Sequence, residues 1–478
     1  MPAVPDAAAT PPPAGRPATP AEQRVDARLD AIRHHPQALR AFMQALPKGG
    51  DLHNHLSGAV STELLVRLAA QDGLCIDRTD TALPPPCRAG TRSAADTRTD
   101  PAFRQRLIRA WSMQDLPPGE SGHDHFFAAF GKFGEVTKRH TGELLADVAG
   151  TAAANHQSYL ETMVSPAGAA ARRLAADVGY DADLARMHRA LLAGGKLDQV
   201  VRDARQEADR ATADFRRTAH CDTATPAPAC RVTYRFISQG TRSAAPEQVF
   251  TQLALGMRLA EHDRRFVAVN LVAPEDGAVA LRDYRLHMRM LDYLHGVYPH
   301  AHITLHAGEL TPGLVKPADL RFHIREAVHT GHAERIGHGV DLAHEDDAEE
   351  LLRTMAHHHI ALESPLTSNA QILGVSGDAH PFQRYRRAGV PVTLATDDPG
   401  ISRTDISHEY QRAATTYDLS YPELKDLART SLEQAFLPGP DLTATPRTGT
   451  TIGLKARLQW RLESAFHRFE QRVLRGTA

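Results

Sequence analysis

Eight short, apolar, β-rich segments punctuate this chain, and longer stretches with helical periodicity separate them. The expected strands occupy residues 50–56, 158–166, 231–238, 265–274, 302–309, 334–340, 359–365 and 390–399. Several are continuously apolar, as strands buried on both faces of a parallel sheet are. Eight such strands, each followed by helix, predict an α/β fold of the (β/α)8 or TIM-barrel type.

Two helix-rich insertions interrupt this alternation, over about 70–150 and 167–230. They follow the first and second strands. Residues 21–46 predict a helical N-terminal extension that is interrupted near Pro36. The first 20 residues are rich in Pro and Ala and predict a disordered tail. We therefore expect residues 21–478 to form a single barrel domain.

The composition is that of an ordinary globular protein, with 478 residues, 42% hydrophobic and 23% charged. The formal net charge of -2 gives no electrostatic reason for a nucleic acid or an anionic membrane as partner. No apolar run approaches the ~20 residues that span a bilayer. A small molecule is the expected ligand class, with neither nucleic acid nor membrane as partner.

Four cysteines form two near pairs, Cys75 with Cys87 and Cys221 with Cys230, each around a short loop that contains proline. Local pairing is the simplest of the three possible connectivities. Disulfides would indicate an oxidising compartment, periplasmic or secreted, whereas four free thiols are the alternative. The first residues lack the basic start and apolar core of a signal peptide, which favours the cytoplasm.

Unusual polar residues stand where the expected strands end. The first strand ends in His53-Asn54-His55, the fifth in HAGE (306–309), the sixth in GHG (337–339) and the eighth in DDP (397–399). In a barrel of this type the carboxyl ends of the strands converge on one face, which carries the chemistry. Because alternate residues of a strand face the same side, His53 and His55 both point into the barrel mouth.

With His306 and Asp397, these two imidazoles predict a metal site of three nitrogens and one oxygen. That donor set suits one Zn²⁺ with a position left for water, whose pKa zinc lowers toward ~7. A lone H-x-H is more often a pair of hydrogen-bonded core histidines. Four polar groups at four strand ends favour the metal. The fourth strand, over 265–274, has no lysine that could bridge a second ion.

Three further residues at these ends suit acid–base chemistry. Glu309, in the loop after the fifth strand, would donate a proton if shielding raises its pKa. His338 would orient the water or take its proton, and Asp398 would accept a hydrogen bond from a substrate N–H. The structural alternatives are a helix-capping glutamate, a histidine bonded to a neighbouring strand and an N-cap aspartate before Pro399.

The ordered set HNHLSGA, HAGE, RIGHG and TDDP resembles the adenosine deaminase family, and the resemblance covers roughly residues 45–470. Four features are similar to the secreted branch, the adenosine-deaminase-related growth factors: PKGGDLHNHLSG, the insertion after the first strand, NLVAPED, and the segment YRFISQGTRSAAPEQVFTQLALGMRLA. The similarity to that branch suggests a homodimer.

The resemblance implies a zinc-dependent barrel that converts adenosine, and by extension 2′-deoxyadenosine, to inosine and ammonia. The implied zinc ligands are His53, His55, His306 and Asp397. Glu309 would protonate the purine at N1, and His338 would assist the attacking hydroxide. Asp398 would contact N7.

This chain departs from the family pattern at two positions. Ser57 stands where many members have an aspartate that contacts the ribose, and Ala273 where the family usually has a glycine whose N–H meets the purine. Both are carried as substrate-binding candidates. The run ESPLTSN (363–369) also resembles a family segment, although Ser368 and Asn369 are typical of a turn.

Two alternatives to adenosine deamination follow. Ser57 keeps open a deaminase of another aminopurine, such as adenine or a modified or 5′-substituted adenosine. A catalytically inactive signalling or binding barrel is the third hypothesis. Every metal and acid–base position is filled, which argues against loss of the chemistry.

Overall fold

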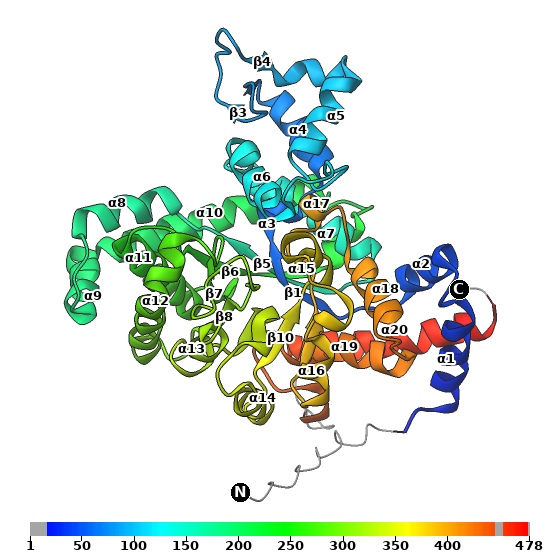
Figure 1. The fold of residues 1–478 in the computed structure, drawn as a ribbon. Helices are drawn as coiled ribbons and strands as arrows, with labels where there is room; N and C mark the ends of the chain where they lie inside the picture. The colour runs from blue at the N-terminus through cyan, green and yellow to red at the C-terminus, as the bar shows by residue number, and fades with distance from the viewer. Residues whose placement is uncertain (1–16, 445–452, 477–478) are drawn as a thin grey trace, which may run out of the picture.

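Eight parallel strands form the central sheet of the computed structural model, which describes residues 17–444 and 453–476 (Figure 1). The strands are β1 (Gly50–His55), β5 (Tyr159–Val164), β6 (Thr233–Thr241), β7 (Phe266–Val272), β8 (His302–Ala307), β9 (Arg335–His338), β10 (Ala361–Ser364) and β11 (Val392–Leu394). They pair in this order around the sheet. The predicted TIM-barrel class is confirmed, and each expected strand is present within a few residues.

The first and last strands meet through the backbone of residues predicted to bind a metal. The Asp397 N–H donates to the His53 carbonyl at 2.9 Å, and the His55 N–H donates to the Asp397 carbonyl at 3.0 Å. An isolated parallel bridge pairs Asn54 with Asp397. The sheet therefore closes into a barrel at the carboxyl end of β1.

Helices surround this barrel and follow its strands in turn. They are α11 (Pro246–His262), α12 (Ala278–Val297), α13 (His323–His329), α14 (Ala348–His357), α15 (Leu366–Leu373), α16 (Phe382–Arg387), α17 (Pro399–Ser402), α18 (Ile406–Thr416) and α19 (Tyr421–Glu433). Short 3-10 turns follow β9 and α15, at Val340–Ala343 and Gly377–Ala379.

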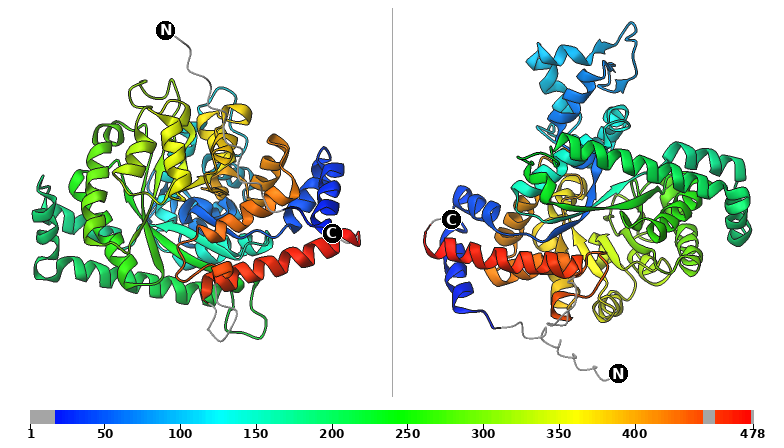
Figure 2. Two further views of the ribbon diagram at one scale, coloured as in Figure 1. Left: turned by 90° about the horizontal axis from the view of Figure 1, so that it is seen from below. Right: turned by 180° about the vertical axis from the view of Figure 1, so that it is seen from behind.

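The two ends of the described chain are tied to the same side of the barrel (Figure 2). The predicted N-terminal extension forms α1 (Pro20–Ile32) and α2 (Pro36–Ala45), separated near Pro36 as expected, and α20 (Leu454–Leu474) packs beside α1. The buried Lys425 ammonium lies 2.7 Å from carboxylates of both Glu22 and Glu470. Residues 1–16 of the expected tail lie outside the described residues.

The first insertion projects from the barrel (Figure 1). Its helices are α3 (Leu56–Ala59), α4 (Thr62–Gln71), α5 (Pro101–Ala110), α6 (Gly122–Thr137) and α7 (Thr141–Ala154). A small antiparallel sheet of β2 (Cys75–Ile76), β3 (Ala82–Leu83) and β4 (Arg92–Ser93) lies between α4 and α5. This sheet was not predicted, because strands of two residues are too short to show a period of two.

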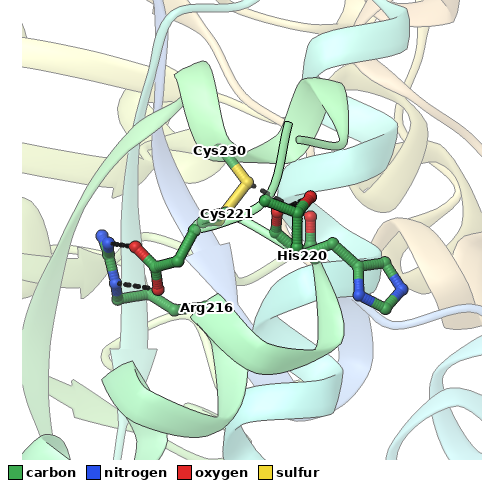
Figure 3. Close-up of a disulfide and its surroundings, with 7 residues drawn as sticks. Arg216, His220, Cys221 and Cys230 are labelled. Carbon is green, nitrogen blue, oxygen red and sulfur yellow. Dashed lines mark hydrogen bonds and ion pairs between the residues drawn. A yellow bond between two sulfur atoms is a disulfide. The ribbon is translucent and has the colours of Figure 1, made fainter. Parts of the chain in front are cut away.

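The second insertion is helical, as predicted, with α8 (Gly168–Val178), α9 (Leu184–Leu192) and α10 (Lys196–Thr218). A 3-10 turn, Pro228–Arg231, then leads into β6. Both predicted cysteine pairs are disulfides, Cys75–Cys87 and Cys221–Cys230. The second joins the end of α10 to that turn, beside an ion pair of Arg216 with Asp222 (Figure 3).

Helix α6 covers part of the barrel mouth. A Cβ atom added to Gly122 would lie 2.1 Å from the Gln371 carbonyl of α15, so the first turn of α6 rests directly on that backbone. One residue later, the His123 ring reaches Asp276, in the loop after β7, at 3.1 Å. The first insertion thus touches the loops on both sides of the mouth. No helix among the described residues has the length and apolarity to cross a bilayer.

The disulfides make a direct prediction about stability. Replacing Cys221 and Cys230 by serine should lower the free energy of unfolding by about 2–3 kcal/mol, because the unfolded chain regains the freedom that the cross-link removes. Denaturant melts of the variant and the parent protein would measure this loss. Thiol titration of the unreduced parent protein should detect no free cysteine. Four titratable thiols and an unchanged melt would contradict the pairing.

Candidate active site

Four ligand atoms from both ends of the chain converge at the closure of the barrel. His53 and His55 end β1, His306 lies on β8, and Asp397 follows β11; all four are buried. The Nε2 atoms of His53 and His55 each lie 3.1 Å from His306 Nε2. Asp397 Oδ1 lies 3.3 Å and 3.2 Å from the two β1 imidazoles. A tetrahedral zinc ion with bonds of about 2.0–2.1 Å needs ligand separations of about 3.3 Å.

The partners of the three Nδ1 atoms indicate the protonation state of the three imidazole rings. Each Nδ1 faces an oxygen from another strand, and the partners are Glu363 for His53 (2.7 Å), Asn270 for His306 (2.8 Å) and Gln239 for His55 (3.3 Å). An oxygen acceptor holds the ring proton on Nδ1, so the Nε2 lone pairs are directed at one another. Three converging lone pairs and a carboxylate oxygen repel unless a cation lies between them. The donor set therefore fits a metal ion.

The electrostatics of the site also favour a positive charge. Burial lowers the pKa of His53, but the carboxylates of Asp397 and Glu363 outweigh it and raise that pKa to about 10. Burial likewise raises the pKa of Asp397, yet hydrogen bonds from His53 and His55 hold it well below its usual range. The group thus keeps its carboxylate ionised and stabilises a cation in front of it, either a proton or a metal.

A buried network of charged side chains lies next to His53 and holds the Glu363 carboxylate that bonds its Nδ1 atom. Arg335 donates from Nε to Glu363 and from Nη2 to Glu161, at 2.5 Å each, and all three side chains are fully buried. Its guanidinium also lies 3.7 Å from the centre of the Phe436 ring. Because every charge has an opposite partner, the network can hold Glu363 ionised against the Nδ1–H of His53.

Asp397 is held by its backbone and by one hydroxyl. Its φ of +60° lies in the left-handed region, which turns the carboxylate away from the line of the strand. The Ser368 hydroxyl donates to Oδ2 at 2.6 Å, which leaves Oδ1 to the imidazoles. Ser368 and Asn369 lie in the first turn of α15, so the turn that was the alternative for these two residues is not formed: both are helical, and their side chains bond Asp397 and His338.

Glu309 occupies the loop after β8, and its main chain is fixed by a second glutamate. Glu275, which follows β7, accepts the N–H groups of Gly308 at 3.1 Å and Glu309 at 2.8 Å, and it also binds His323 Nδ1 at 2.6 Å. Burial, with the charges of Asp397 and Glu275, raises the pKa of Glu309 to about 8. At this pKa the carboxyl is protonated at neutral pH and can donate a proton. It caps no helix.

His338 ends β9 in the left-handed region, with φ of +70°. Its Nδ1 lies 2.8 Å from the terminal amide of Asn369 and 3.7 Å from Glu309 Oε1. Its Nε2 finds no hydrogen-bond partner in the part of the chain that the structure describes. Burial lowers the pKa of His338, so the ring is neutral at pH 7. The bond to a neighbouring strand, considered as a structural alternative, is not made.

Asp398 is buried beside the ligand group, and its Oδ1 has no partner within the described ranges. It stands at the N-cap of α17 but makes no side-chain capping bond there. A Cβ atom on Gly58 would lie 1.8 Å from Asp398 Oδ1, so only glycine fits at that position. Burial and the adjacent Asp397 raise the pKa of Asp398 well above its usual value. The protonated form of this carboxyl is therefore favoured relative to that of an exposed aspartate.

The two positions that depart from the family pattern also lie at the mouth. Ser57 is half-buried in α3, two residues after the ligand His55. Ala273 follows β7 with φ of +89°, a backbone conformation that suits glycine better than alanine. This geometry explains why a glycine is usual there.

Sequence reasoning missed the residues that support the ligands: Glu161, Gln239, Asn270, Glu275, Arg335, Glu363 and Ser368. Most lie on strands whose ends were recognised. A polar residue inside an otherwise apolar strand, as in FVAVNLV or ALES, is the one signal that could have found them.

A closed parallel barrel that presents a buried His3Asp group and a protonated carboxyl at its carboxyl end defines a metal-binding barrel with an acid–base site. The sequence model for adenosine deaminase matches residues 121–444, about two thirds of the chain. The chain belongs to the adenosine deaminase family.

Curated relatives match a shorter stretch. The adenosine deaminase of Klebsiella pneumoniae (strain 342) is 43% identical over 137 residues, 28% of this chain and 38% of that protein. The adenosine deaminase of Escherichia coli (strain SE11) is 40% identical over 144 residues, 30% of this chain and 40% of that protein. The chain thus spans about two fifths of the length of the curated relatives that it matches.

Solved structures agree over the whole fold. An adenine deaminase from Arthrobacter aurescens covers 88% of this chain, with a TM-score of 0.56 and 16% identity, and 99% of that chain is matched. The N6-methyl-AMP deaminase from Arabidopsis thaliana covers 90%, with a TM-score of 0.58 and 20% identity, and again 99% of its chain is matched. At these identities the likeness establishes the barrel fold.

The hydroxyl behind Asp397 makes a prediction about metal affinity. Ser368→Ala should weaken binding of Zn²⁺ by about 10- to 100-fold, because the carboxylate loses the bond that orients it. Ser364→Ala is the matched control: Ser364 is also buried, but its hydroxyl has no partner among the described residues. Competition with a chromophoric chelator would measure both affinities. Equal affinities in the two variants would remove Ser368 from the site.

Proposed function

We propose that this protein hydrolyses adenosine, and also 2′-deoxyadenosine, to inosine or deoxyinosine and ammonia. The observation that carries the proposal is the meeting of a cation-demanding His3Asp group with a protonated Glu309 at one barrel mouth. Hydrolysis of an aromatic amine needs both an activated water and a proton donor to the ring. Membership of the adenosine deaminase family supports the same reaction.

The metal of this proposal is one Zn²⁺, held by His53, His55, His306 and Asp397. Three imidazole nitrogens and one carboxylate oxygen at tetrahedral spacing support zinc over magnesium or calcium, which prefer oxygen ligands. Bound there, zinc would act as a Lewis acid that makes water nucleophilic at neutral pH.

The residues around the ion have separate proposed roles. Glu309 donates its proton to purine N1, which withdraws electrons from C6. The water oxygen forms a bond to C6 while the C6–N6 bond breaks. One water proton leaves with the amino group as ammonia, and the other returns to the Glu309 carboxylate. Inosine keeps the hydrogen at N1, so atoms and charges balance. Asp398 contacts N7. Because N7 can only accept, Asp398 would donate in its protonated form, which its raised pKa favours.

Ser57 and Ala273 are the proposed contacts to the rest of the substrate. Ala273 would offer its backbone N–H to the purine, and the Ser57 hydroxyl would face the ribose. A serine is shorter than the aspartate of many relatives, and this favours a second candidate: an aminopurine without a bound ribose, or an adenosine with a 5′ substituent.

Further proposals concern the protein as a whole. We take residues 21–478 as one catalytic domain whose partner is a small purine nucleoside, and the resemblance to the secreted branch supports a homodimer. The two disulfides support an oxidising compartment, periplasmic or extracellular. The thiol titration described above, repeated on protein isolated from its native host, tests the compartment.

Turnover of a small panel of purines tests the reaction and the substrate together. Zinc-loaded protein should convert adenosine and 2′-deoxyadenosine to products that absorb like inosine. Conversion of adenine or AMP with adenosine left intact would favour the second candidate. No turnover of any purine by a protein that holds zinc would contradict deamination and favour a binding role.

The proton donor makes a pH-dependent prediction. Glu309→Gln should keep the metal and lose about 10²-fold or more of kcat, because a neutral amide cannot protonate N1. Since the raised pKa keeps Glu309 protonated up to about pH 8, parent activity should persist to that pH and fall above it. A pH series of kcat/KM would measure the fall. Near-parent activity in the variant would exclude Glu309 as the acid.

A further inference from the structure

Three short hydrogen-bond contacts in series start at His338 Nδ1, the ring nitrogen that faces away from the candidate metal ligands. His338 Nδ1 lies 2.8 Å from Asn369 Oδ1, and Asn369 Nδ2 lies 2.8 Å from His380 Nε2. The oxygen and nitrogen of an amide are nearly alike in shape, so the hydrogen bonds decide which of them faces which ring. His380 Nδ1 accepts the backbone N–H of Phe382, at the start of α16, at 3.1 Å. All three side chains are buried, so the hydrogen bonds between them have no competition from bulk water.

The backbone N–H of Phe382, at the far end of this series of hydrogen bonds, fixes which atom donates and which accepts at every step. A backbone N–H can only donate, so His380 Nδ1 must carry a lone pair. Burial, together with the neighbouring His338, lowers the pKa of His380 to about 4, and the ring is therefore neutral. A neutral ring with a lone pair on Nδ1 has its proton on Nε2.

The amide of Asn369 must match that proton. With its nitrogen toward His380, two N–H donors would face each other at 2.8 Å in a buried site, which leaves polar groups unsatisfied. With its oxygen toward His380, the amide accepts on that side and offers its NH2 group to His338. His338 Nδ1 must then accept, which satisfies every atom in the chain.

We infer that Asn369 and His380 are positioning residues that hold His338 in the tautomer with its proton on Nε2. His338 Nε2 is the atom without a partner among the described residues, and His338 groups with Glu309 and Asp397 at the mouth. His338 therefore presents a hydrogen-bond donor to the reacting oxygen. It orients the water rather than taking its proton. This choice between the two roles rests on the proposed function, whereas the tautomer does not.

Replacing the Asn369 amide by a carboxylate of the same shape should reverse the tautomer of His338. Asn369→Asp keeps the shape but turns the group facing His338 into an acceptor only, so the His338 proton should move to Nδ1. Two-bond ¹H–¹⁵N correlation spectra of zinc-loaded protein labelled with ¹⁵N-histidine report the tautomer directly. The signals of His338 are those lost in His338→Gln. We expect an Nε2–H pattern in the parent protein and an Nδ1–H pattern in Asn369→Asp.

Kinetics and a matched control complete the test. In Asn369→Asp, kcat on the turned-over purine should fall about tenfold or more with KM within about twofold, because only the donor at the reacting oxygen is lost. Gln383→Glu makes the same amide-to-carboxylate change on α16, where Gln383 donates to the Tyr417 carbonyl and accepts from Arg386, away from His338. It should leave both the tautomer and kcat unchanged.

Either of two results would overturn the inference: an Nδ1–H pattern for His338 in the parent protein, or an Nε2–H pattern that persists in Asn369→Asp. The spectra need no substrate. A protein that holds zinc and turns over no purine would therefore contradict the proposed reaction while the tautomer is still measured. An amide-controlled tautomer in an inactive protein would support the positioning role alone.

Discussion

The mutual repulsion of three imidazole lone pairs and one carboxylate, gathered at a single point, is the constraint on which this barrel depends. The four side chains come from strands β1 and β8 and from the residue Asp397 after β11, and the backbone bonds that close the barrel involve three of them. A cation at this point relieves the repulsion and links the two edges of the sheet. Closure of the barrel and assembly of the site therefore share the same residues, His53, His55 and Asp397.

The buried polar residues that bond the four candidate ligands show how an apolar barrel can contain such a site. An oxygen from a neighbouring residue bonds each ligand on the side away from the site. One of these partners, Glu363, shares the positive charge of Arg335 with Glu161. Unpaired charges at that depth would be costly, whereas an alternating series of opposite charges can persist. The interior of the barrel therefore contains an ordered series of buried charged side chains as well as apolar ones.

The sequence predicted the barrel and its ligands because both are local patterns. His53 and His55 share a strand face through the period of two, and HAGE, GHG and DDP mark strand ends without knowledge of their partners. Contacts between segments far apart in the chain were out of reach: Glu275 under Glu309, or Ser368 behind Asp397. The role of Ser368 and Asn369 stayed open because Ser and Asn are also common in turns, whereas here they lie in the first turn of α15 and bond Asp397 and His338.

The position of the closing residues has a consequence for biosynthesis. His53 emerges early in translation and Asp397 only after more than three hundred further residues, so a nascent chain holds no complete ligand set. His53 and His55 can contact Asp397 only after nearly the whole barrel has been synthesised. Contacts of such high sequence separation are slow to form. A chain interrupted before β11 would therefore lack both the contacts that close the sheet and Asp397, and the four candidate ligand atoms could not come together.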